Sequence, residues 1–233
     1  YFEGGEPFLY YALLAKSVRL AAEMGFSVGI VSNAYWANTV ADAVENLQPF
    51  AGRIDDLTVS SDLYHCDECL GERPQNALVA AKWLNIPTGM ISINQPEVAG
   101  EASVMYRGRA STLVTRVALH PWKQFNECPH EDLREPGRVH LDPLGNLHIC
   151  QGVVIGNLFE KSLRQICDEY DADAHPICGP LLDGGPAALV TEYNLAHASS
   201  YADACHLCYE ARTTLRTRFP ELLAPNQMYG VDL

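Results

Sequence analysis

Helix and strand patterns alternate through the amino-terminal part of the chain, and this alternation limits the possible folds more than any other feature. Apolar residues recur at helical spacing over residues 9–24, and Gly25 is placed to end that helix. Short apolar runs that end in polar residues predict buried strands. Such alternation implies right-handed crossovers and a parallel sheet. The predicted strands cover residues 27–33, 57–60 and 89–94, and the remaining helices of this part cover residues 38–47 and 76–84.

The polar residues at these strand ends are candidates for ligand binding. In parallel α/β sheets, ligands bind beyond the carboxyl ends of the strands. The residues that we expect to meet there are Ser32, Asn33, Ser60, Asp62 and Asn94, together with Glu6.

The first seven residues predict the end of a strand, a glycine turn and the start of a helix. Gly4 and Gly5 permit backbone angles and close approaches that a Cβ would block. Pro7 suits the first position of a helix, where no N–H is needed. Glu6 and the carbonyls of the turn are acceptors of the kind that an ammonium group requires. The simpler interpretation is a strand-to-helix turn that carries a carboxylate near the helix dipole.

Composition and charge exclude some classes of protein. The 233 residues suffice for one core, or for one core and a small appended domain. The formal net charge of −13, from 16 basic and 29 acidic residues, argues against a nucleic-acid partner or an anionic membrane surface. No apolar run reaches the length of a transmembrane helix.

The pattern changes after about residue 107. Residues 121–152 are rich in Pro, Gly, His and Cys, and within them residues 138–142 and 145–150 predict a hairpin with a Pro-Leu-Gly-Asn turn. Helical spacing predicts helices over residues 158–170 and 203–219, and we expect a loop through Gly184-Gly185-Pro186 between them.

Eight cysteines are spread along the chain, and their pattern favours a metal site in a reduced, cytosolic protein over disulfides. Cys205 and Cys208 form a Cys-x2-Cys pair at a predicted helix start. With Cys128 from a loop and Cys150 from the hairpin, these thiolates can surround one [4Fe–4S] cluster or one tetrahedral zinc ion. The spacing alone leaves both metals open.

The other cysteines have weaker claims. Cys167 lies on the apolar face of a predicted helix, so we expect it in the core. Cys178 is a predicted loop thiol and an alternative fourth ligand. Cys66 and Cys69 follow a strand end, where they form a metal site, a redox pair, a substrate-facing loop or two unpaired thiols. Two histidines beside the proposed ligands, His148 and His206, are candidates to ligate or hydrogen-bond a cluster, although a surface or hairpin position is the commoner explanation.

Two sets of motifs resemble a known enzyme family. Gly4-Gly5-Glu6-Pro7 resembles the Gly-Gly-Glu-Pro segment of radical S-adenosylmethionine (SAM) enzymes. The order Cys128, Gly145-x4-Cys150 and Cys205-x2-Cys208 is similar to the carboxy-terminal extension of the SPASM/twitch type, which carries an auxiliary [4Fe–4S] cluster. Gly108-Arg109-Ala110 and Gly156-Asn157-Leu158 are also similar to that family. The chain departs from it where Ser32-Asn33-Ala34 replaces the usual Thr-Asn-Gly strand end.

The resemblance implies a fold and a function. The fold would be a partial (β/α) TIM-like barrel lacking its first strand over residues 1–120, then a small α+β cysteine-rich auxiliary-cluster domain over residues 121–233. The function would be reductive cleavage of SAM to a 5′-deoxyadenosyl radical that modifies a peptide, protein or small-molecule substrate in the cytoplasm, with a flavodoxin or ferredoxin as electron donor. The resemblance assigns the methionine end of SAM to Gly4, Gly5, Glu6 and Pro7, the rest of SAM to Ser32, Asn33, Ser60 and Asp62, and the auxiliary cluster to Cys128, Cys150, Cys205 and Cys208.

One signature of that family is missing. Its core cluster is held by a Cys-x3-Cys-x2-Cys loop that precedes the glycine motif, and these 233 residues contain no such triplet. We therefore expect the chain to be a fragment that binds the auxiliary cluster but does not cleave SAM. Two other interpretations remain: a zinc-stabilised α/β module without radical chemistry, and an electron-transfer protein that uses a cluster without SAM.

Overall fold

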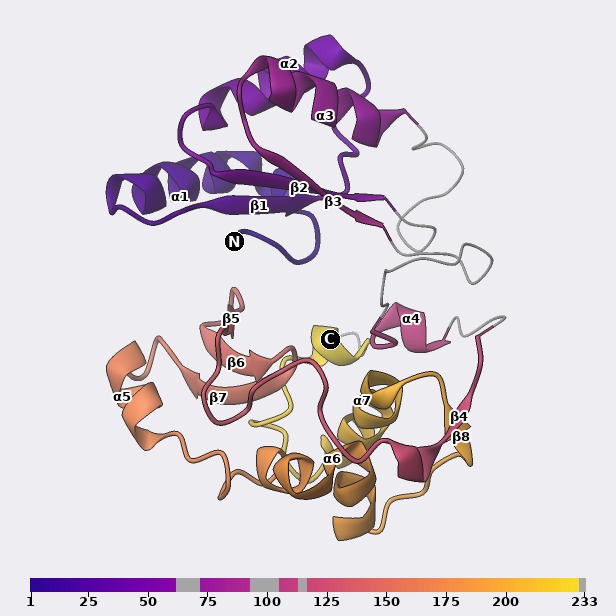
Figure 1. Ribbon diagram of the computed structural model, residues 1–233. Helices are drawn as coiled ribbons and strands as arrows, with labels where there is room; N and C mark the ends of the chain where they lie inside the picture. Colours follow the sequence, from indigo (N-terminus) through magenta and orange to yellow (C-terminus); the bar gives the residue numbers. More distant parts are fainter. Residues whose placement is uncertain (62–71, 93–104, 113–116, 231–233) are drawn as a thin grey trace. The chain divides into compact units, whose positions relative to one another are not determined.

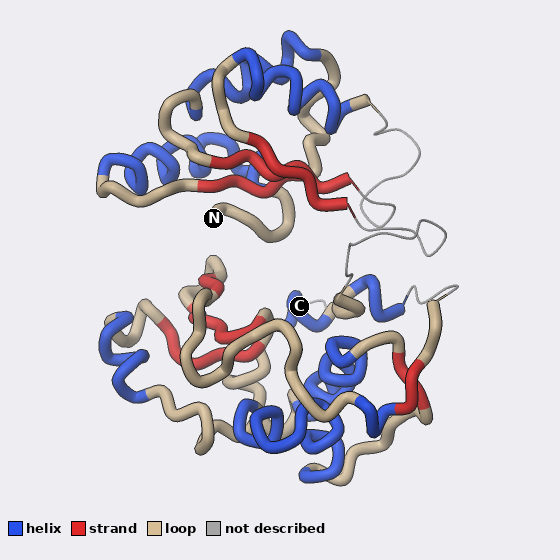
Figure 2. The backbone as a smooth tube through the Cα atoms, viewed as in Figure 1, coloured by secondary structure: helices blue, strands red, loops and turns tan. Residues whose placement is uncertain are grey.

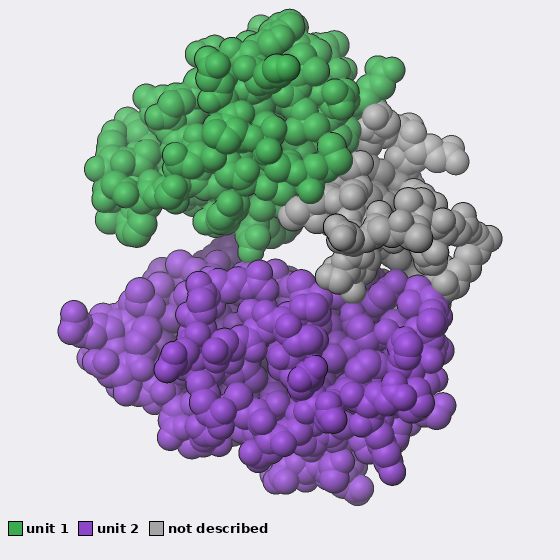
Figure 3. All heavy atoms as spheres, in the orientation of Figure 1, with its two compact units in different colours: residues 1–104 green, residues 105–233 purple. Residues whose placement is uncertain are grey.

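The computed structural model describes residues 1–61, 72–92, 105–112 and 117–230. The chain divides into two compact units, Tyr1–Val104 and Met105–Leu233 (Figure 3). Residues 105–120 fall in the second compact unit, and the predicted domain boundary at residue 120 stays a prediction. The backbone N–H of Tyr106 donates to a carboxylate oxygen of Asp203 at 3.1 Å.

The first unit is built on a three-stranded parallel sheet in the order β1-β2-β3 (Figure 1). Beside β1, Phe2 forms a further parallel bridge to Ile30. Its N–H donates to the Gly29 carbonyl at 2.8 Å, and its carbonyl accepts from the Val31 N–H at 3.0 Å. The predicted strand end before the glycine turn is therefore confirmed. The strands are β1 (Gly29–Ser32), β2 (Asp56–Ser61) and β3 (Thr88–Ser92).

The predicted helices of this unit are present, with small shifts at their ends. A 3-10 turn precedes α1, and Gly25 follows it with a φ of +85°. A capping box between Thr39 and Asp42 begins α2. Pro74 in the first turn lets α3 begin earlier than expected. The helical segments are η1 (Pro7–Tyr10), α1 (Tyr11–Glu23), α2 (Val40–Leu47), η2 (Gln48–Phe50) and α3 (Arg73–Trp83).

One apolar core joins these helices to the sheet. It includes Val18 of α1, Leu47 of α2, Ala80 of α3 and the strand residues Ile30 and Leu57, all fully buried. Figure 2 shows α2 and α3 together over the strands. Parallel strands linked by helices are the units from which (β/α) barrels are built, and the expected partial barrel remains a prediction.

The second unit combines antiparallel strands with helices. Its larger sheet has the order β5-β6-β7, and a pair of short strands, β4 and β8, forms a second sheet. The predicted hairpin is the β5–β6 pair, and β7 is a strand that the sequence analysis did not predict. The strands are β4 (His120–Pro121), β5 (His140–Leu141), β6 (Asn146–Cys150), β7 (Val153–Asn157) and β8 (Ser200–Tyr201). The helical segments are α4 (Arg109–Thr112), η4 (Trp122–Gln124), α5 (Leu163–Glu169), α6 (Cys178–Glu192), α7 (Ala204–Leu215) and η5 (Asn226–Tyr229).

Helix α5 is shorter than predicted. The expected position of Cys167 in the core is also wrong. The helix begins only after Ser162, which forms a capping box with Gln165. Ile166 is buried and packs against Gly156 of β7. The next side chain points about 100° further round the helix, so Cys167 is exposed rather than part of the core.

Helix α6 occupies the segment for which the sequence predicts a loop. The predicted position of Cys178 is therefore also wrong. Two helical segments meet at a kink, where Gly184 and Gly185 have non-helical backbone angles. Cys178 is the first residue of α6 and is completely buried, not a loop thiol. Within the described ranges, no helix is both long and apolar enough to cross a membrane.

Candidate metal centre and candidate cofactor-binding turn

The glycine turn adopts backbone angles that favour glycine. Gly4 has a φ of +86° and Gly5 a φ of +58°, both in the left-handed region. Both glycines are exposed, and Pro7 begins the 3-10 turn that follows them. The local structure is therefore the strand end, turn and helix start that the sequence predicts.

The Glu6 side chain ties this turn to the end of β1. It is buried, and its Oε1 accepts from the Phe8 N–H at 3.1 Å and from the Ser32 hydroxyl at 2.9 Å. Its Oε2 accepts from the Asn33 N–H at 2.7 Å. A carboxylate has about four acceptor positions. Donors from the described part of the chain fill three of them, which leaves one position on Oε2 for a further donor.

Ser32 connects the turn to the neighbouring strand. Its hydroxyl oxygen accepts from the Trp36 indole N–H at 2.9 Å, and its carbonyl accepts from the Ser60 hydroxyl at 3.4 Å. The structure thus brings Glu6, Ser32, Asn33 and Ser60 together at the carboxyl ends of β1 and β2. The other predicted members of this site, Asp62 and Asn94, lie outside the described residues, as do Cys66 and Cys69.

In the second unit, all four predicted metal-binding cysteines line one small cavity of about 30 Å³. Cys150 ends β6, and Cys205 and Cys208 lie in the first turns of α7, three residues apart and so on one face. Cys128 follows η4. Cys178 lines the same cavity, so five thiols surround a site for which four suffice.

A tight turn before β6 places Cys150. Gly145 has a φ of +84°, and a Cβ there would lie 2.7 Å from the Phe159 ring. The carboxylate of Asp142 accepts from the Leu144 N–H at 2.8 Å and the Asn146 N–H at 3.0 Å, and it lies 3.1 Å from Nε2 of the fully buried His148. These bonds hold the segment from Gly145 to Cys150 in one conformation and so position Cys150.

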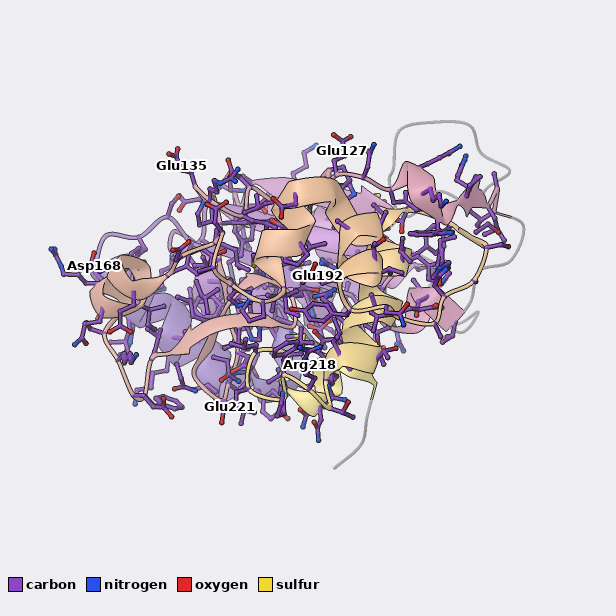
Figure 4. The ribbon with its side chains drawn as sticks, turned by 90° about the horizontal axis from the view of Figure 1, so that it is seen from below. Glu127, Glu135, Asp168, Glu192, Arg218 and Glu221 are labelled. Atoms are coloured by element: carbon purple, nitrogen blue, oxygen red, sulfur yellow. The ribbon has the colours of Figure 1, made fainter. Side chains whose placement is uncertain are left out.

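The kink in α6 places Cys128. A Cβ on Gly185 would lie 2.2 Å from the backbone nitrogen of Glu127, so only glycine lets this loop approach. The Ala187 N–H also donates to the Phe125 carbonyl at 3.0 Å. In Figure 4 the Glu127 side chain projects away from the unit, and the next residue, Cys128, lines the cavity.

Helix α7 presents its Cys-x2-Cys pair through a capped first turn. Asp203 is the cap, because its carboxylate accepts from the His206 N–H at 2.7 Å. His206 is itself buried, and its Nδ1 lies 3.3 Å from the Ala202 nitrogen. Arg107 also lines the cavity, and its Nη1 donates to Sγ of Cys150 at 3.7 Å.

The environment of the thiols is apolar. Burial raises the pKa of Cys178 to about 12 and that of Cys208 to about 11, and it also raises the pKa of Cys205. These thiols are therefore protonated at neutral pH in the metal-free protein. A metal that binds them releases their protons, because thiolate is the ligand form.

The donor set fits a thiophilic metal. Among the residues that the structure describes, no three His, Cys, Asp or Glu side chains are grouped closely enough to hold a single metal ion. The cysteines instead surround a shared volume.

The comparisons with known proteins do not assign a family. No family model matches the chain, and no curated protein is significantly similar to it.

Proposed function

We propose that this chain is part of a radical SAM enzyme in which Cys128, Cys150, Cys205 and Cys208 hold an auxiliary [4Fe–4S] cluster. The observation that carries the proposal is their common cavity: residues from a loop, a hairpin and a helix start, far apart in the sequence, line one small space. Thiolate sulfur is the ligand that iron–sulfur clusters require.

The first unit would hold SAM. The remaining acceptor position of Glu6 and the exposed turn at Gly4 and Gly5 suit the ammonium group of the methionine part. Pro7 fixes the start of the helix behind this turn, and Ser32, Asn33, Ser60 and Asp62 are candidates to contact the rest of SAM. The bound cofactor supplies a reductively generated 5′-deoxyadenosyl radical, and the protein orients it and excludes water.

The auxiliary cluster would pass electrons or bind the substrate. A flavodoxin or ferredoxin would supply electrons, and a peptide, protein or small molecule would be modified. The net charge of −13 disfavours nucleic acid and an anionic membrane surface as partners. The unpaired thiols agree with a reducing compartment, and we place the enzyme in the cytoplasm.

Serine variants of the cysteines test the proposal. The chain is purified and reconstituted without oxygen, and bound iron and the visible absorbance of the cluster are measured. We expect Cys128→Ser, Cys150→Ser, Cys205→Ser and Cys208→Ser each to lose most of the iron, while the exposed Cys167→Ser retains it.

Two outcomes of that experiment would overturn the proposal, and a Cys178→Ser variant measured beside the others would show whether one ligand must be replaced. A colourless protein that binds zinc would favour the zinc-stabilised module. Equal loss of iron in Cys167→Ser would show that the iron is not bound at this site. Iron lost in Cys178→Ser but kept in Cys128→Ser would replace one ligand by the other.

A further inference from the structure

One positive charge is buried among the cavity cysteines. Arg212 lies on α7 one turn after Cys208, lines the same cavity and is only 2% exposed. Its Nη1 donates to the Gln151 carbonyl at 2.9 Å, and its Nε donates to the Cys208 carbonyl at 3.4 Å. The guanidinium carbon lies 5.8 Å from the centre of the Tyr229 ring.

These partners orient the guanidinium group but do not neutralise it. Carbonyl oxygens and an aromatic ring carry no net charge, and no carboxylate in the described part of the chain forms an ion pair with Arg212. A buried charge without an opposite charge is strongly unfavourable. Arg212 therefore lies at the wall of the cysteine cavity without a carboxylate partner in the described part of the chain.

A thiolate-bound metal centre supplies the missing negative charge. Four thiolates on an oxidised [4Fe–4S] cluster, or on a zinc ion, leave a net charge of about −2. Such a centre would lie beside Arg212 on the inner wall and beside Arg107, which already donates to the Cys150 sulfur at 3.7 Å. The two guanidinium groups are opposite in sign to the charge of the centre and equal to it in number.

We infer that Arg212 is the buried counter-ion of the metal centre and that it sets the affinity of the site for metal. The inference rests on the proposed function for the location of the centre, but the charge argument is the same for a cluster and for zinc. Because coupling is reciprocal, the metal stabilises the buried arginine as much as the arginine stabilises the metal.

The test uses zinc and the cluster side by side in the full 233-residue chain. Zinc affinity of the metal-free protein is measured against a competing chelator, and thermal unfolding is measured with and without metal. Arg212→Gln keeps an N–H donor but removes the charge, and Arg212→Lys keeps the charge. Arg216→Gln is the matched control, because Arg216 lies one turn further along and contacts the same Tyr229 ring at 5.0 Å without lining the cavity.

We expect Arg212→Gln to weaken zinc binding about 10- to 100-fold, as is typical for groups that support metal ligands without binding the metal. The rise in Tm on metal binding should shrink in the same variant, and the reduction potential of the cluster should fall. Arg212→Lys should recover most of the affinity, and Arg216→Gln should bind like the parent.

The outcomes separate this inference from the proposed function. Equal affinities of Arg212→Gln and the parent, with a lower Tm in both metal states, would show that Arg212 only supports the fold and would overturn the inference. A parent that binds zinc but assembles no cluster would overturn the proposed function alone. A parent that binds neither would overturn both.

Discussion

Gly185→Ala should displace the loop that carries Cys128, because the substituted side chain meets backbone rather than another side chain. The new Cβ would lie 2.2 Å from the Glu127 nitrogen and 2.4 Å from the Asn126 carbonyl carbon. Backbone atoms cannot rotate away, so either the loop or the helix must move. The cavity would then lose Cys128 from its wall.

The expected loss of stability can be worked from two effects. Gly185 has φ +62° and ψ −161°, a region that is essentially restricted to glycine, and holding another residue there costs about 1–3 kcal/mol. Overpacking at a tight contact costs a further 1–3 kcal/mol or so. The sum, about 2–6 kcal/mol, is a large part of the roughly 5–15 kcal/mol that stabilises a typical domain.

Urea unfolding of the second unit and iron content after reconstitution measure the effect. Gly137→Ala is the control, because a Cβ there would meet nothing within 4 Å; we expect it to change the free energy of unfolding by less than about 1 kcal/mol. The reasoning is refuted if Gly185→Ala unfolds at the same urea concentration as the parent and retains its iron.

Three further predictions concern the cofactor turn, pH and catalysis. Glu6→Gln should raise the Kd for SAM about 10- to 100-fold in calorimetry, as expected for a lost charge-assisted hydrogen bond. The control Glu3→Gln, at an exposed residue, should leave the Kd unchanged. If Glu6→Gln binds SAM as tightly as the parent, Glu6 is not part of the site. Burial lowers the pKa of His175 below its ordinary 6.5, and its Nδ1 accepts from the N–H groups of Ile177 and Cys178. The unfolded chain thus binds the proton more readily, so stability should be full above pH 6.5 and fall as the pH drops below it; an unchanged slope in His175→Asn would contradict this. The reconstituted chain given SAM and a reductant should form no 5′-deoxyadenosine, since its sequence contains no Cys-x3-Cys-x2-Cys triplet; detection of this product by mass spectrometry would refute the prediction.

Much of the first unit could be predicted because its signals are local. Apolar runs identified the three parallel strands, and the glycines identified the turn that the positive φ angles require. The predicted Cys-x2-Cys pair at a helix start is also confirmed, because the Asp203 cap precedes it directly. These features depend on neighbours within a few residues, where pattern and conformation are closely linked.

The missed features depend on contacts that are distant in the sequence. The kink at Gly185 exists because the loop before Cys128 packs on it, and no local pattern shows that approach. The sequence predicts a loop thiol at Cys178, but the helix that buries it forms against α7 and η4. The apolar spacing of α5 does not show which side of the helix packs on the unit: Ile166 faces Gly156 of β7, and Cys167, about 100° further round, is exposed.

The most direct test of the account is the mass of the reconstituted chain under non-denaturing, oxygen-free conditions. The proposed auxiliary centre predicts one bound unit of four irons and four sulfides per chain. It also predicts that this unit is lost from the Cys205→Ser variant and retained in Cys167→Ser. A single zinc ion in place of that unit, or a chain without any bound metal, would contradict the central claim.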